Sequence, residues 1–375
     1  MHTSLCDLFG IKYPIFGFTP SPEVAAAITR AGGMGVLGAI RYANGEELEA
    51  ALQWMDANVD GKPYGLDIVM PMAYVGQGVA ENVTQLDEMI SPEHRAFVNK
   101  ILAQHQVPLL PEDADQPTGI TGWMHTFARE QVDIALKHPI KLLANALGPP
   151  PKDVIEKAHS HGVKVAALAG KAKHAARHQS SGVDIVVAQG HEAGGHTGEV
   201  TTMVLVPEVV DAVDPLPVLA AGGIGTGRQI AASLALGAQG VWMGSLWLTC
   251  EEYRLEPSSE TGNSVVKDKL LAATSSDTIR SKVISGKYAR MLKTEWTSAW
   301  SADDSPGPLP MPLQGLLVAE AEARIRHHQT RSLLGSPVGQ IVGQMNEVLP
   351  VQEVMDNLVT EFEAAVEMIR RSSSV

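Results

Sequence analysis

Residues 183–198 read VDIVVAQGHEAGGHTG, an apolar run that leads directly into a loop with four glycines and two histidines. A nearly continuous β-branched run is typical of a parallel strand that is covered on both faces. The glycines suit a backbone that passes close to a ligand or adopts positive φ. Because the active sites of βα barrels lie in the loops that follow the strands, this stretch predicts a barrel strand with a site at its carboxyl end.

The same alternation of short apolar strands and helical segments runs along most of the chain. Eight strands are predicted, at Tyr13–Phe18, Gly35–Ala39, Gly65–Met70, Ile140–Leu147, Lys164–Ala169, Val183–Gln189, Pro217–Ala221 and Gly240–Gly244. Helix signals lie between them. Ser21 and Pro22, for example, are the expected cap and first residue of one helix. The pattern predicts an α/β fold, a (β/α)8 TIM barrel, with a doubly wound parallel sheet as the alternative.

Two regions depart from this alternation. Residues 71–123 are too long for a simple connection after the third strand and contain helical runs at 81–89 and 92–104, so we expect an inserted helical excursion that acts as a lid. Beyond Trp247 the pattern becomes helical, and residues 301–375 are expected to form a C-terminal helical extension. We predict that residues 1–375 form a single TIM-barrel domain with both additions.

The composition argues against several classes of function. Acidic side chains outnumber basic ones by 42 to 29, which gives a net charge of -13, and we therefore expect no nucleic-acid partner. Only Cys6 and Cys250 are present, which excludes a disulfide framework and indicates a reducing compartment. No run reaches the ~18 apolar residues that span a bilayer, so we expect a cytoplasmic protein that acts on a small molecule without a membrane partner.

Two more glycine-rich segments follow the seventh and eighth predicted strands. Residues 220–228, AAGGIGTGR, precede a helix, and free backbone N–H groups at the amino end of that helix are expected to bind phosphate. Residues 240–245, GVWMGS, place a glycine and a hydroxyl where barrels commonly bind phosphate. The spacing differs from that of a Rossmann site, and the acid expected about 20 residues later is absent. A phosphate-bearing cofactor beside a histidine is therefore predicted.

These segments occur in an order that resembles the nitronate monooxygenase family, formerly called 2-nitropropane dioxygenases. The resemblance is carried by VDIVVAQGHEAGGHTGE, LAAGGIGTGRQIAASLALGAQGVWMGS and SGKYARMLKTEW, together with EVAAAITRAGGMGVLGA and VGQIVGQM. It implies a TIM barrel that binds FMN. Because FMN-dependent enoyl-acyl carrier protein reductases and NADH:quinone reductases share this barrel, the motifs indicate the cofactor more narrowly than the substrate.

The resemblance also implies roles for individual residues. His196 would be the catalytic residue beside the flavin. Gln189 and Gly194 would contact the flavin, and Gly222, Gly223, Gly244 and Ser245 would hold its phosphate. The full set of expected cofactor-binding residues, with no metal, is Phe18, Thr19, Asp67, Gln189, Gly194, Gly195, Ala221, Gly222, Gly223, Met243, Gly244 and Ser245.

Three positions depart from the pattern of the family. Gly17-Phe18-Thr19-Pro20 replaces the usual Gln-Gly-x-Met after the first strand, Asp67 replaces an asparagine, and Leu168 stands where some members carry lysine. Backbone contacts to the cofactor can survive these changes, whereas the preference for substrate or reductant can differ.

The first hypothesis for function is an FMN-dependent oxidoreductase, a nitronate monooxygenase that oxidises alkyl nitronates with dioxygen to carbonyl compounds and nitrite. His196 would stabilise the anionic substrate or take a proton α to the nitro group. The alternative is an NAD(P)H-dependent flavin reductase of a quinone or an enoyl thioester. A third hypothesis is a barrel that binds a phosphorylated metabolite without redox chemistry. The physiological substrate, the choice between NADH and NADPH, and assembly into a homo-oligomer stay open.

Four polar residues near these motifs have other expected roles. His191 is the other candidate for the role of His196, but because it precedes the glycine pair it is expected to be structural or to lie at the rim of the site. Glu192 is expected to orient the loop by accepting backbone N–H groups. For Tyr288 and Arg290 the sequence leaves two alternatives open: each side chain either lies near the cofactor or is exposed to solvent.

Overall fold

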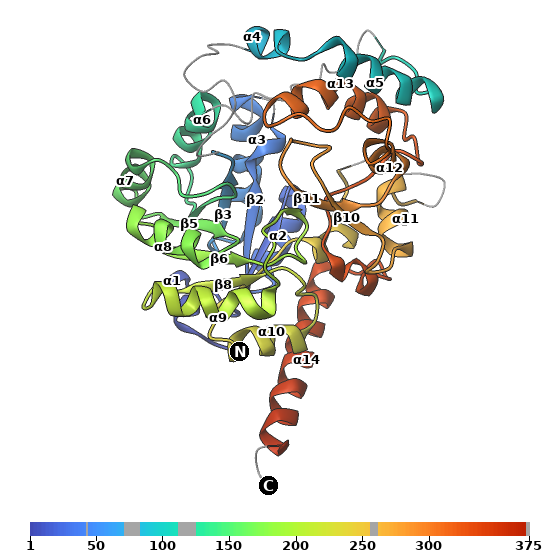
Figure 1. Ribbon diagram of the computed structural model, residues 1–375. Coiled ribbons are helices and arrows are strands. Elements are labelled where there is room, and N and C mark those ends of the chain that lie inside the picture. Colours follow the sequence, from blue (N-terminus) through green and yellow to red (C-terminus); the bar gives the residue numbers. More distant parts are fainter. Residues whose placement is uncertain (43, 71–82, 112–124, 256–261, 373–375) are drawn as a thin grey trace.

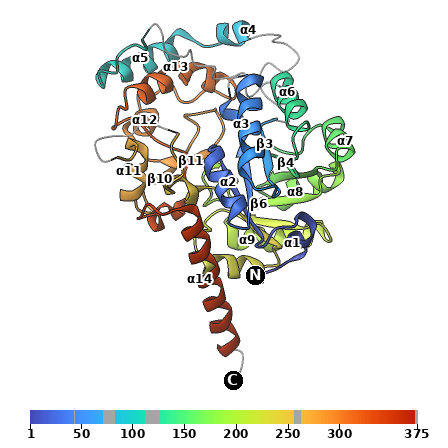
Figure 2. The same cartoon turned by 180° about the vertical axis from the view of Figure 1, so that it is seen from behind.

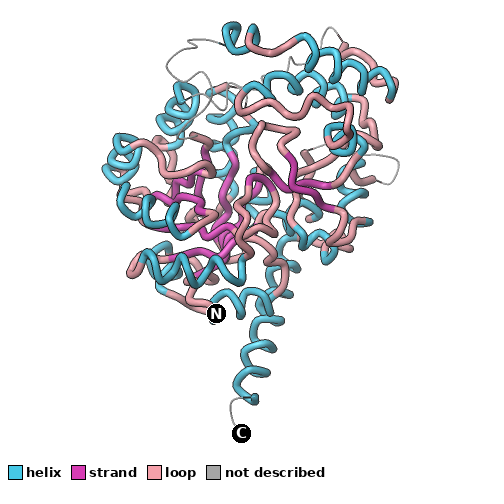
Figure 3. Tube along the Cα trace, viewed as in Figure 1, coloured by secondary structure: helices cyan, strands magenta, loops and turns pink. Residues whose placement is uncertain are grey.

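A closed barrel of eight parallel strands forms the centre of the protein, in the order β1-β2-β3-β4-β5-β6-β8-β9, with helices around it (Figures 1 and 3). The structure is a computed structural model and describes residues 1–375 except 43, 71–82, 112–124, 256–261 and 373–375. Strand β1 pairs with both β2 and β9, and this double pairing closes the barrel. The TIM-barrel prediction is confirmed and the doubly wound sheet is excluded.

All eight predicted barrel strands are present. They are β1 (Ile15–Thr19), β2 (Met34–Gly38), β3 (Gly65–Ile68), β4 (Leu142–Asn145), β5 (Lys164–Ala169), β6 (Ile185–Gln189), β8 (Val218–Ala221) and β9 (Gly240–Met243). Successive side chains of each strand point to opposite faces, and both faces are apolar because one lines the barrel interior and the other contacts the helices. This two-sided burial explains why the strands could be recognised as continuous apolar runs.

The helices around the barrel follow the strands, except α1, which precedes β1. They are α1 (Ser4–Phe9), α2 (Pro22–Arg30), α3 (Gly45–Asn58), α6 (His125–Ala135), α7 (Lys152–Ser160), α8 (Ala172–Ser181), α9 (Thr202–Val213) and α10 (Gly227–Ala235), with a 3-10 turn η1 (Ala39–Arg41) after β2. Helix α2 begins as predicted, with the Ser21 side chain accepting the N–H of Val24 and Pro22 in the first turn.

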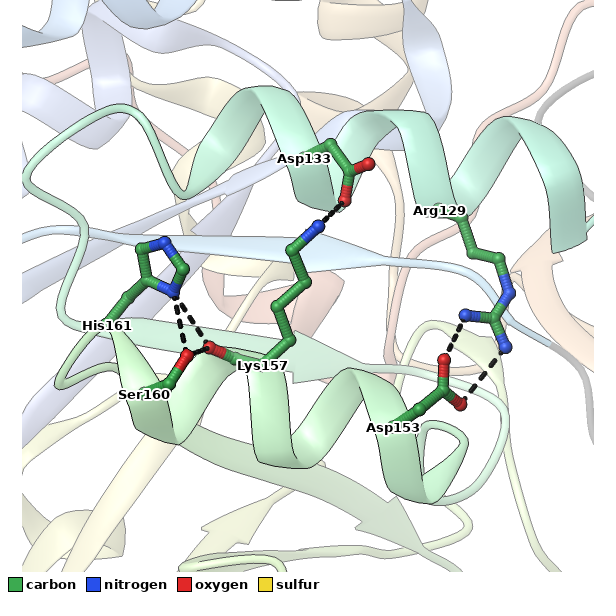
Figure 4. A network of polar contacts seen from close by, with 6 residues as sticks. All are labelled: Arg129, Asp133, Asp153, Lys157, Ser160 and His161. Atoms are coloured by element: carbon green, nitrogen blue, oxygen red, sulfur yellow. Dashed lines mark hydrogen bonds and ion pairs between the residues drawn. The ribbon is translucent and has the colours of Figure 1, made fainter.

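Helices α6 and α7 are joined on the outer surface by two ion pairs (Figure 4). Lys157 Nζ lies 2.6 Å from an Asp133 oxygen, and the Arg129 guanidinium binds both oxygens of Asp153. A hydrogen bond from Arg129 lowers the pKa of Asp153. Because these side chains are open to solvent, the pairs fix how the two helices lie against each other more than they stabilise the fold.

Helix α1 covers the amino end of the barrel. Leu5 and Phe9 of this helix belong to the hydrophobic cluster that fills the barrel interior, and the Phe9 ring meets the Phe16 ring edge-on with centroids 5.6 Å apart. With this end covered, the carboxyl ends of the strands are the open end of the barrel.

A second hydrophobic cluster lies beside the barrel. Its elements include α4 (Val83–Glu88), α5 (Pro92–Gln104), η3 (Ser245–Thr249), α11 (Val265–Ala272), α12 (Glu295–Trp300), α13 (Leu313–His327) and η4 (Gln340–Gln344). The described helices of the excursion pack in this cluster, where the centroids of the Phe97 and Trp300 rings lie 4.9 Å apart. The excursion and the C-terminal region therefore share one apolar core.

A small antiparallel sheet also lies in this region. Strands β10 (Thr278–Ser281) and β11 (Ala289–Leu292) form a hairpin, and β7 (Gly195–His196) adds to the edge of β11. The region beyond Trp247 is therefore not helical throughout, because this hairpin precedes the predicted extension 301–375, which contains α13 and the helix Val351–Ser372. The two strands are only four residues long, and a run that short has no periodicity that separates strand from helix.

The long helix α14 (Val351–Ser372) ends the described chain. Its first half packs against α10 and α2, whereas its last turns extend away from the rest of the molecule (Figures 1 and 2). No helix within the described ranges is both long enough and apolar enough to cross a bilayer.

Candidate active site

A cavity of about 390 Å³ opens at the carboxyl ends of the barrel strands. Ligand sites typically enclose ~300–1,000 Å³, so the volume is that of a binding site. Residues 84–111 of the excursion, which the structure describes, do not line it. The lid predicted from the rest of that segment, 71–82 and 112–123, lies outside the described residues.

Nearly all predicted site residues line this cavity. They are Phe18, Asp67, Gln189, Gly194, Gly195, His196, Ala221, Gly222, Gly223, Met243, Gly244 and Ser245. Thr19 is outside it. Its side chain is buried and its Oγ1 accepts the N–H of Ser21 at 3.1 Å, so Thr19 shapes the turn before α2.

The turn after β8 requires glycine at two successive positions. Gly222 and Gly223 have φ values of +98° and +69°. A Cβ on Gly222 would also lie 3.0 Å from the Thr202 hydroxyl oxygen and 3.1 Å from the Gly190 carbonyl oxygen. Successive residues in such a conformation form a concave turn whose N–H groups can bind an anion.

The carboxylate of Glu192 stabilises this turn through Thr202. Glu192 accepts the backbone N–H of Thr202 at 2.9 Å, and its Oε2 lies 3.0 Å from the Thr202 hydroxyl. That hydroxyl lies 2.9 Å from the Gly222 carbonyl oxygen. Glu192 thus orients the loop by accepting a backbone N–H, as its sequence position predicted.

The amino end of α10 does not have the free donors that the sequence predicted. Gln229 Oε1 accepts the N–H groups of Gly225 and Thr226, and the Gly227 N–H donates to Glu361 Oε2 of α14 at 2.8 Å. A Cβ on Gly227 would lie 2.2 Å from a backbone nitrogen of α14. This end of the helix is therefore capped and packed against another helix, unlike the open helix end that the sequence predicted.

His196 is held in place by the small sheet. It lies on β7 opposite Ala289 of β11, and its Nε2 is 2.7 Å from the Ser285 hydroxyl oxygen. Burial first, and then the positive charge of Lys287, lower the pKa of His196 to about 4. The ring is therefore neutral at pH 7 where it borders the cavity.

Asp67 places a carboxyl group at the cavity wall on β3. Its Oδ1 is buried and has no hydrogen-bond partner among the described residues. Burial raises the pKa of Asp67 well above its usual value, which favours the uncharged acid.

Comparison with known proteins identifies the family to which this arrangement belongs. The family model described as nitronate monooxygenase matches residues 2–361. The chain belongs to the nitronate monooxygenase family. It is an oxidoreductase, and the family implies a flavin cofactor and a small-molecule substrate.

Relatives of the nitronate monooxygenase family match along most of their length. A Mycobacterium tuberculosis protein named "Putative monooxygenase Rv1533" is 49% identical over 373 residues, which are 96% of each chain. A Staphylococcus saprophyticus protein named "Probable nitronate monooxygenase" is 30% identical over 324 residues, covering 82% of this chain and 83% of the relative.

Solved structures agree with the fold. FabK from Thermotoga maritima superposes with a TM-score of 0.74 at 26% identity, covering 99% of both chains. A nitroalkane oxidase from Streptomyces ansochromogenes has a TM-score of 0.76 at 23% identity, covering 98% of this chain and 100% of that one. The second likeness shows the fold alone.

The cavity fits the flavin that membership of the nitronate monooxygenase family implies. The Gly222–Gly223 turn borders the cavity with backbone alone, and the Ser245 hydroxyl at the tip of β9 accepts the Gly339 N–H at 2.8 Å while its own proton can be donated. The unpaired Asp67 oxygen adds an acceptor at the wall. These donors and acceptors are complementary to the polar atoms of a flavin.

Two of the positions that depart from the family pattern place apolar side chains in the cavity wall, namely Phe18 and Leu168. The Phe18 ring lies parallel to Trp242, 18° from coplanar with centroids 6.3 Å apart. Leu168 contributes an uncharged side chain where some nitronate monooxygenases carry lysine. Among the described residues, the positive charge that acts on His196 is therefore supplied by Lys287 and not by a lysine at position 168.

The other polar residues of the motifs have mainly structural contacts. The His191 backbone is held by Val200 and by Arg290, whose Nε donates to the His191 carbonyl at 3.0 Å. Arg290 also donates to Thr278 Oγ1 and is buried, so it joins the loop to the hairpin. Tyr288 is 48% exposed and lies outside the lining of this cavity.

Sequence reasoning missed three residues that build the site. Ser285 is hydrogen-bonded to the ring of His196, and the positive charge of Lys287 lowers the pKa of that ring. Gly339 lets the η4 segment approach the loop, since a Cβ there would lie 2.7 Å from the Glu192 carbonyl oxygen. All three lie within or next to the motifs SGKYAR and VGQIVGQM. The glycine of the second motif was a usable signal for close approach, whereas the serine needed the hairpin to be known.

Proposed function

We propose that the protein is an FMN-dependent monooxygenase that oxidises alkyl nitronates with dioxygen to carbonyl compounds and nitrite. The observation that carries the proposal is the position of His196, a neutral ring held by Ser285 at the wall of the cavity that also contains the three glycine segments. Membership of the nitronate monooxygenase family supports it.

The cofactor of the proposal is FMN. The Gly222–Gly223 turn and the Gly244–Ser245 tip would hold its single phosphate, and Gln189, Gly194 and Asp67 would border the rest of the molecule. When bound, FMN supplies the redox chemistry, while the protein supplies binding, orientation and electrostatics.

His196 would orient the nitronate. A nitronate is already deprotonated at the carbon α to nitrogen, so the substrate needs a hydrogen-bond donor and a balancing charge more than it needs a base. A neutral imidazole donates one hydrogen bond, and the positive charge that acts on His196 from Lys287 would balance the anion. Of the two roles expected for His196, stabilisation of the anion is the one this geometry supports.

The proposal is tested by the purified protein and three reductants. The absorbance spectrum and the mass of the released cofactor distinguish FMN from other flavins. Under anaerobic conditions we expect ethylnitronate to bleach the flavin absorbance at the rate of turnover, faster than NADH or NADPH does. With dioxygen present, nitrite should accumulate as the nitronate is consumed.

Two outcomes contradict the proposal. Rapid bleaching by NADH or NADPH with no reaction of the nitronate would favour the flavin reductase. A colourless protein that cannot be reconstituted with FMN would leave the phosphometabolite barrel as the remaining hypothesis.

A further inference from the structure

A second cavity, of about 430 Å³, lies next to the flavin cavity. Ala146, Leu168, Gln189 and His196 border both cavities, so a molecule in the second one can reach the ring of His196. We call this second cavity the basic pocket.

The basic pocket carries more positive than negative charge. Lys171 and Arg177 come from the start and the body of the α8 segment, Arg280 from β10 and Lys287 from the loop between β10 and β11, while Glu199 is the one carboxylate among the described residues of its lining. The chain as a whole has a net charge of -13. Positive charge collected at one place in an acidic protein requires an explanation other than composition.

Close backbone contacts bring these charges beside His196. A Cβ on Gly198 would lie 2.7 Å from the Gly170 carbonyl oxygen, so the loop before α8 crosses directly over the loop after β7. Lys171 follows this crossing, and Arg177 lies six positions further along the sequence, with both side chains in the lining of the pocket. The crossing makes the pocket a built part of the fold.

Arg280 is held from the opposite side. Its guanidinium lies 5.0 Å from the centroid of the Tyr288 ring and donates to the Thr197 carbonyl at 3.3 Å. Its Nε is buried and has no hydrogen-bond partner among the described residues. Arg280 also lines the pocket, and a guanidinium has five N–H donors, more than the Thr197 carbonyl accepts, so donors remain that a ligand anion can bind.

His174, one of three histidines in the described lining of the pocket, is affected by the nearby positive charges. Partial burial first, and then the charges of Arg177, Lys171 and Lys173, lower the pKa of His174. Like charges repel one another, so such a cluster becomes favourable when an anion is bound.

The number of charges selects the class of anion. A nitronate carries one negative charge and would be balanced by Lys287 alone. A phosphate ester carries ~1.5–2 charges at pH 7 and three strong acceptor oxygens, and arginine binds such groups through two N–H donors. We propose that the basic pocket binds the phosphate groups of a phosphorylated substrate whose reactive end reaches His196. This inference goes beyond nitronate oxidation and does not rest on it.

The inference is tested by calorimetric titration of the flavin-loaded protein. The probes are inorganic pyrophosphate, adenosine 2′,5′-bisphosphate and adenosine 3′,5′-bisphosphate, with adenosine as the uncharged comparison. We expect the phosphorylated probes to bind and adenosine not to, with affinity that falls as salt is added. Preference for the 2′,5′ compound points to a nicotinamide dinucleotide phosphate, for the 3′,5′ compound to a coenzyme A thioester, and equal binding of pyrophosphate to a phosphate group without a nucleotide. Each of these three outcomes supports the pocket.

A double variant, Lys171→Gln with Arg177→Gln, identifies the binding surface. We expect its affinity for the phosphorylated probes to fall about tenfold for each charge removed. Lys173→Gln is the matched control, because Lys173 is exposed on the same helix and does not line the pocket. Unchanged flavin content would show that the variants are folded.

Two results would overturn the inference. One is binding of the phosphorylated probes no tighter than binding of adenosine. The other is a loss of affinity in Lys173→Gln equal to that in the double variant. Both are read without nitronate turnover, so a failure here is separate from a failure of the proposed reaction.

Discussion

His196 is the residue on which sequence and geometry agree most closely. Its backbone belongs to β7, its Nε2 lies 2.7 Å from Ser285 Oγ, and its ring borders both cavities. This position beside two ligand-sized cavities is the one that the proposed role of His196 requires.

Replacement of His196 by Asn tests its role. We expect kcat/KM for ethylnitronate to fall about 100-fold or more, the usual contribution of a positioned acid–base or hydrogen-bonding group, with flavin content unchanged. Steady-state oxygen uptake measures the rate. Ser285→Ala is the comparison and should lose less, since Ser285 acts by positioning the ring. Turnover of His196→Asn at the wild-type rate would remove His196 from the reaction.

Asp67 provides a second prediction at this scale. Its folded-state pKa is raised, so its contribution to stability is fully present below the unfolded value of about 3.9 and is lost as pH rises through the folded value. Asp67→Asn cannot ionise. We expect the variant without cofactor to gain stability relative to the wild type on going from pH 4 to pH 7. Urea unfolding at both pH values measures it, and a constant difference would contradict the prediction.

At the scale of elements, the pairing of β7 with β11 explains which parts of the site could be predicted. The residues of the glycine loop are adjacent in sequence, and their types alone indicated a ligand site. Their partners Ser285 and Lys287 lie about 90 residues later on a short hairpin. The hairpin forms by tertiary pairing rather than local preference, and no pattern within single segments reveals that.

The turn after β8 gives a prediction with a matched control. Gly222→Ala should destabilise the protein by ~1–2 kcal/mol because of its positive φ and should also weaken FMN binding several-fold, because the new Cβ would press on Thr202 and Gly190. Gly182 has a similar φ of +91° with no atom closer than 4.0 Å to an added Cβ. Gly182→Ala should therefore lose stability while its FMN affinity, measured by fluorescence titration, stays unchanged. Equal loss of FMN affinity in both variants would contradict the assigned turn.

The capped end of α10 gives a prediction that separates two explanations of its glycines. Glu361→Ala removes the acceptor of the Gly227 N–H and should cost about 1 kcal/mol of stability, as the loss of a helix cap does. FMN affinity should stay the same. If the amino end of α10 bound the phosphate, removing the nearby carboxylate would instead tighten FMN binding, which the same titration would detect.

At the scale of the whole molecule, the barrel followed from sequence and the second core did not. The eight barrel strands are buried on both faces and so are visible as apolar runs, and the predicted ranges overlap every one of them. The second cluster joins residues near Phe97 to residues near Trp300. Its members are spread over a long stretch of chain in short elements, and no local periodicity indicates that they meet.

The pH dependence of the stability of the whole fold depends in part on His196. The pKa of His196 is about 4 in the folded chain, whereas an exposed histidine has a pKa of 6.5. Above pH 6.5 the ring is neutral in both the folded and the unfolded state. As the pH falls from 6.5 to 4, His196 becomes protonated in the unfolded chain but stays neutral in the folded one. The free energy of unfolding therefore decreases across this pH range.

We therefore expect the protein without cofactor to lose on the order of 1–3 kcal/mol of unfolding free energy between about pH 7 and pH 4.5 through His196, and His196→Asn to lack this part of the loss. Urea unfolding at several pH values measures both proteins. His174 and His178, whose pKa values are also lowered, contribute equally to the two curves and cancel in their difference. His161→Asn, a change at an exposed histidine, should follow the wild-type curve. Parallel curves for the wild type and His196→Asn would mean that the pKa of His196 is the same in the folded and the unfolded state. His196 would then not be held neutral by the fold, and its proposed role, which depends on a neutral ring, would be contradicted.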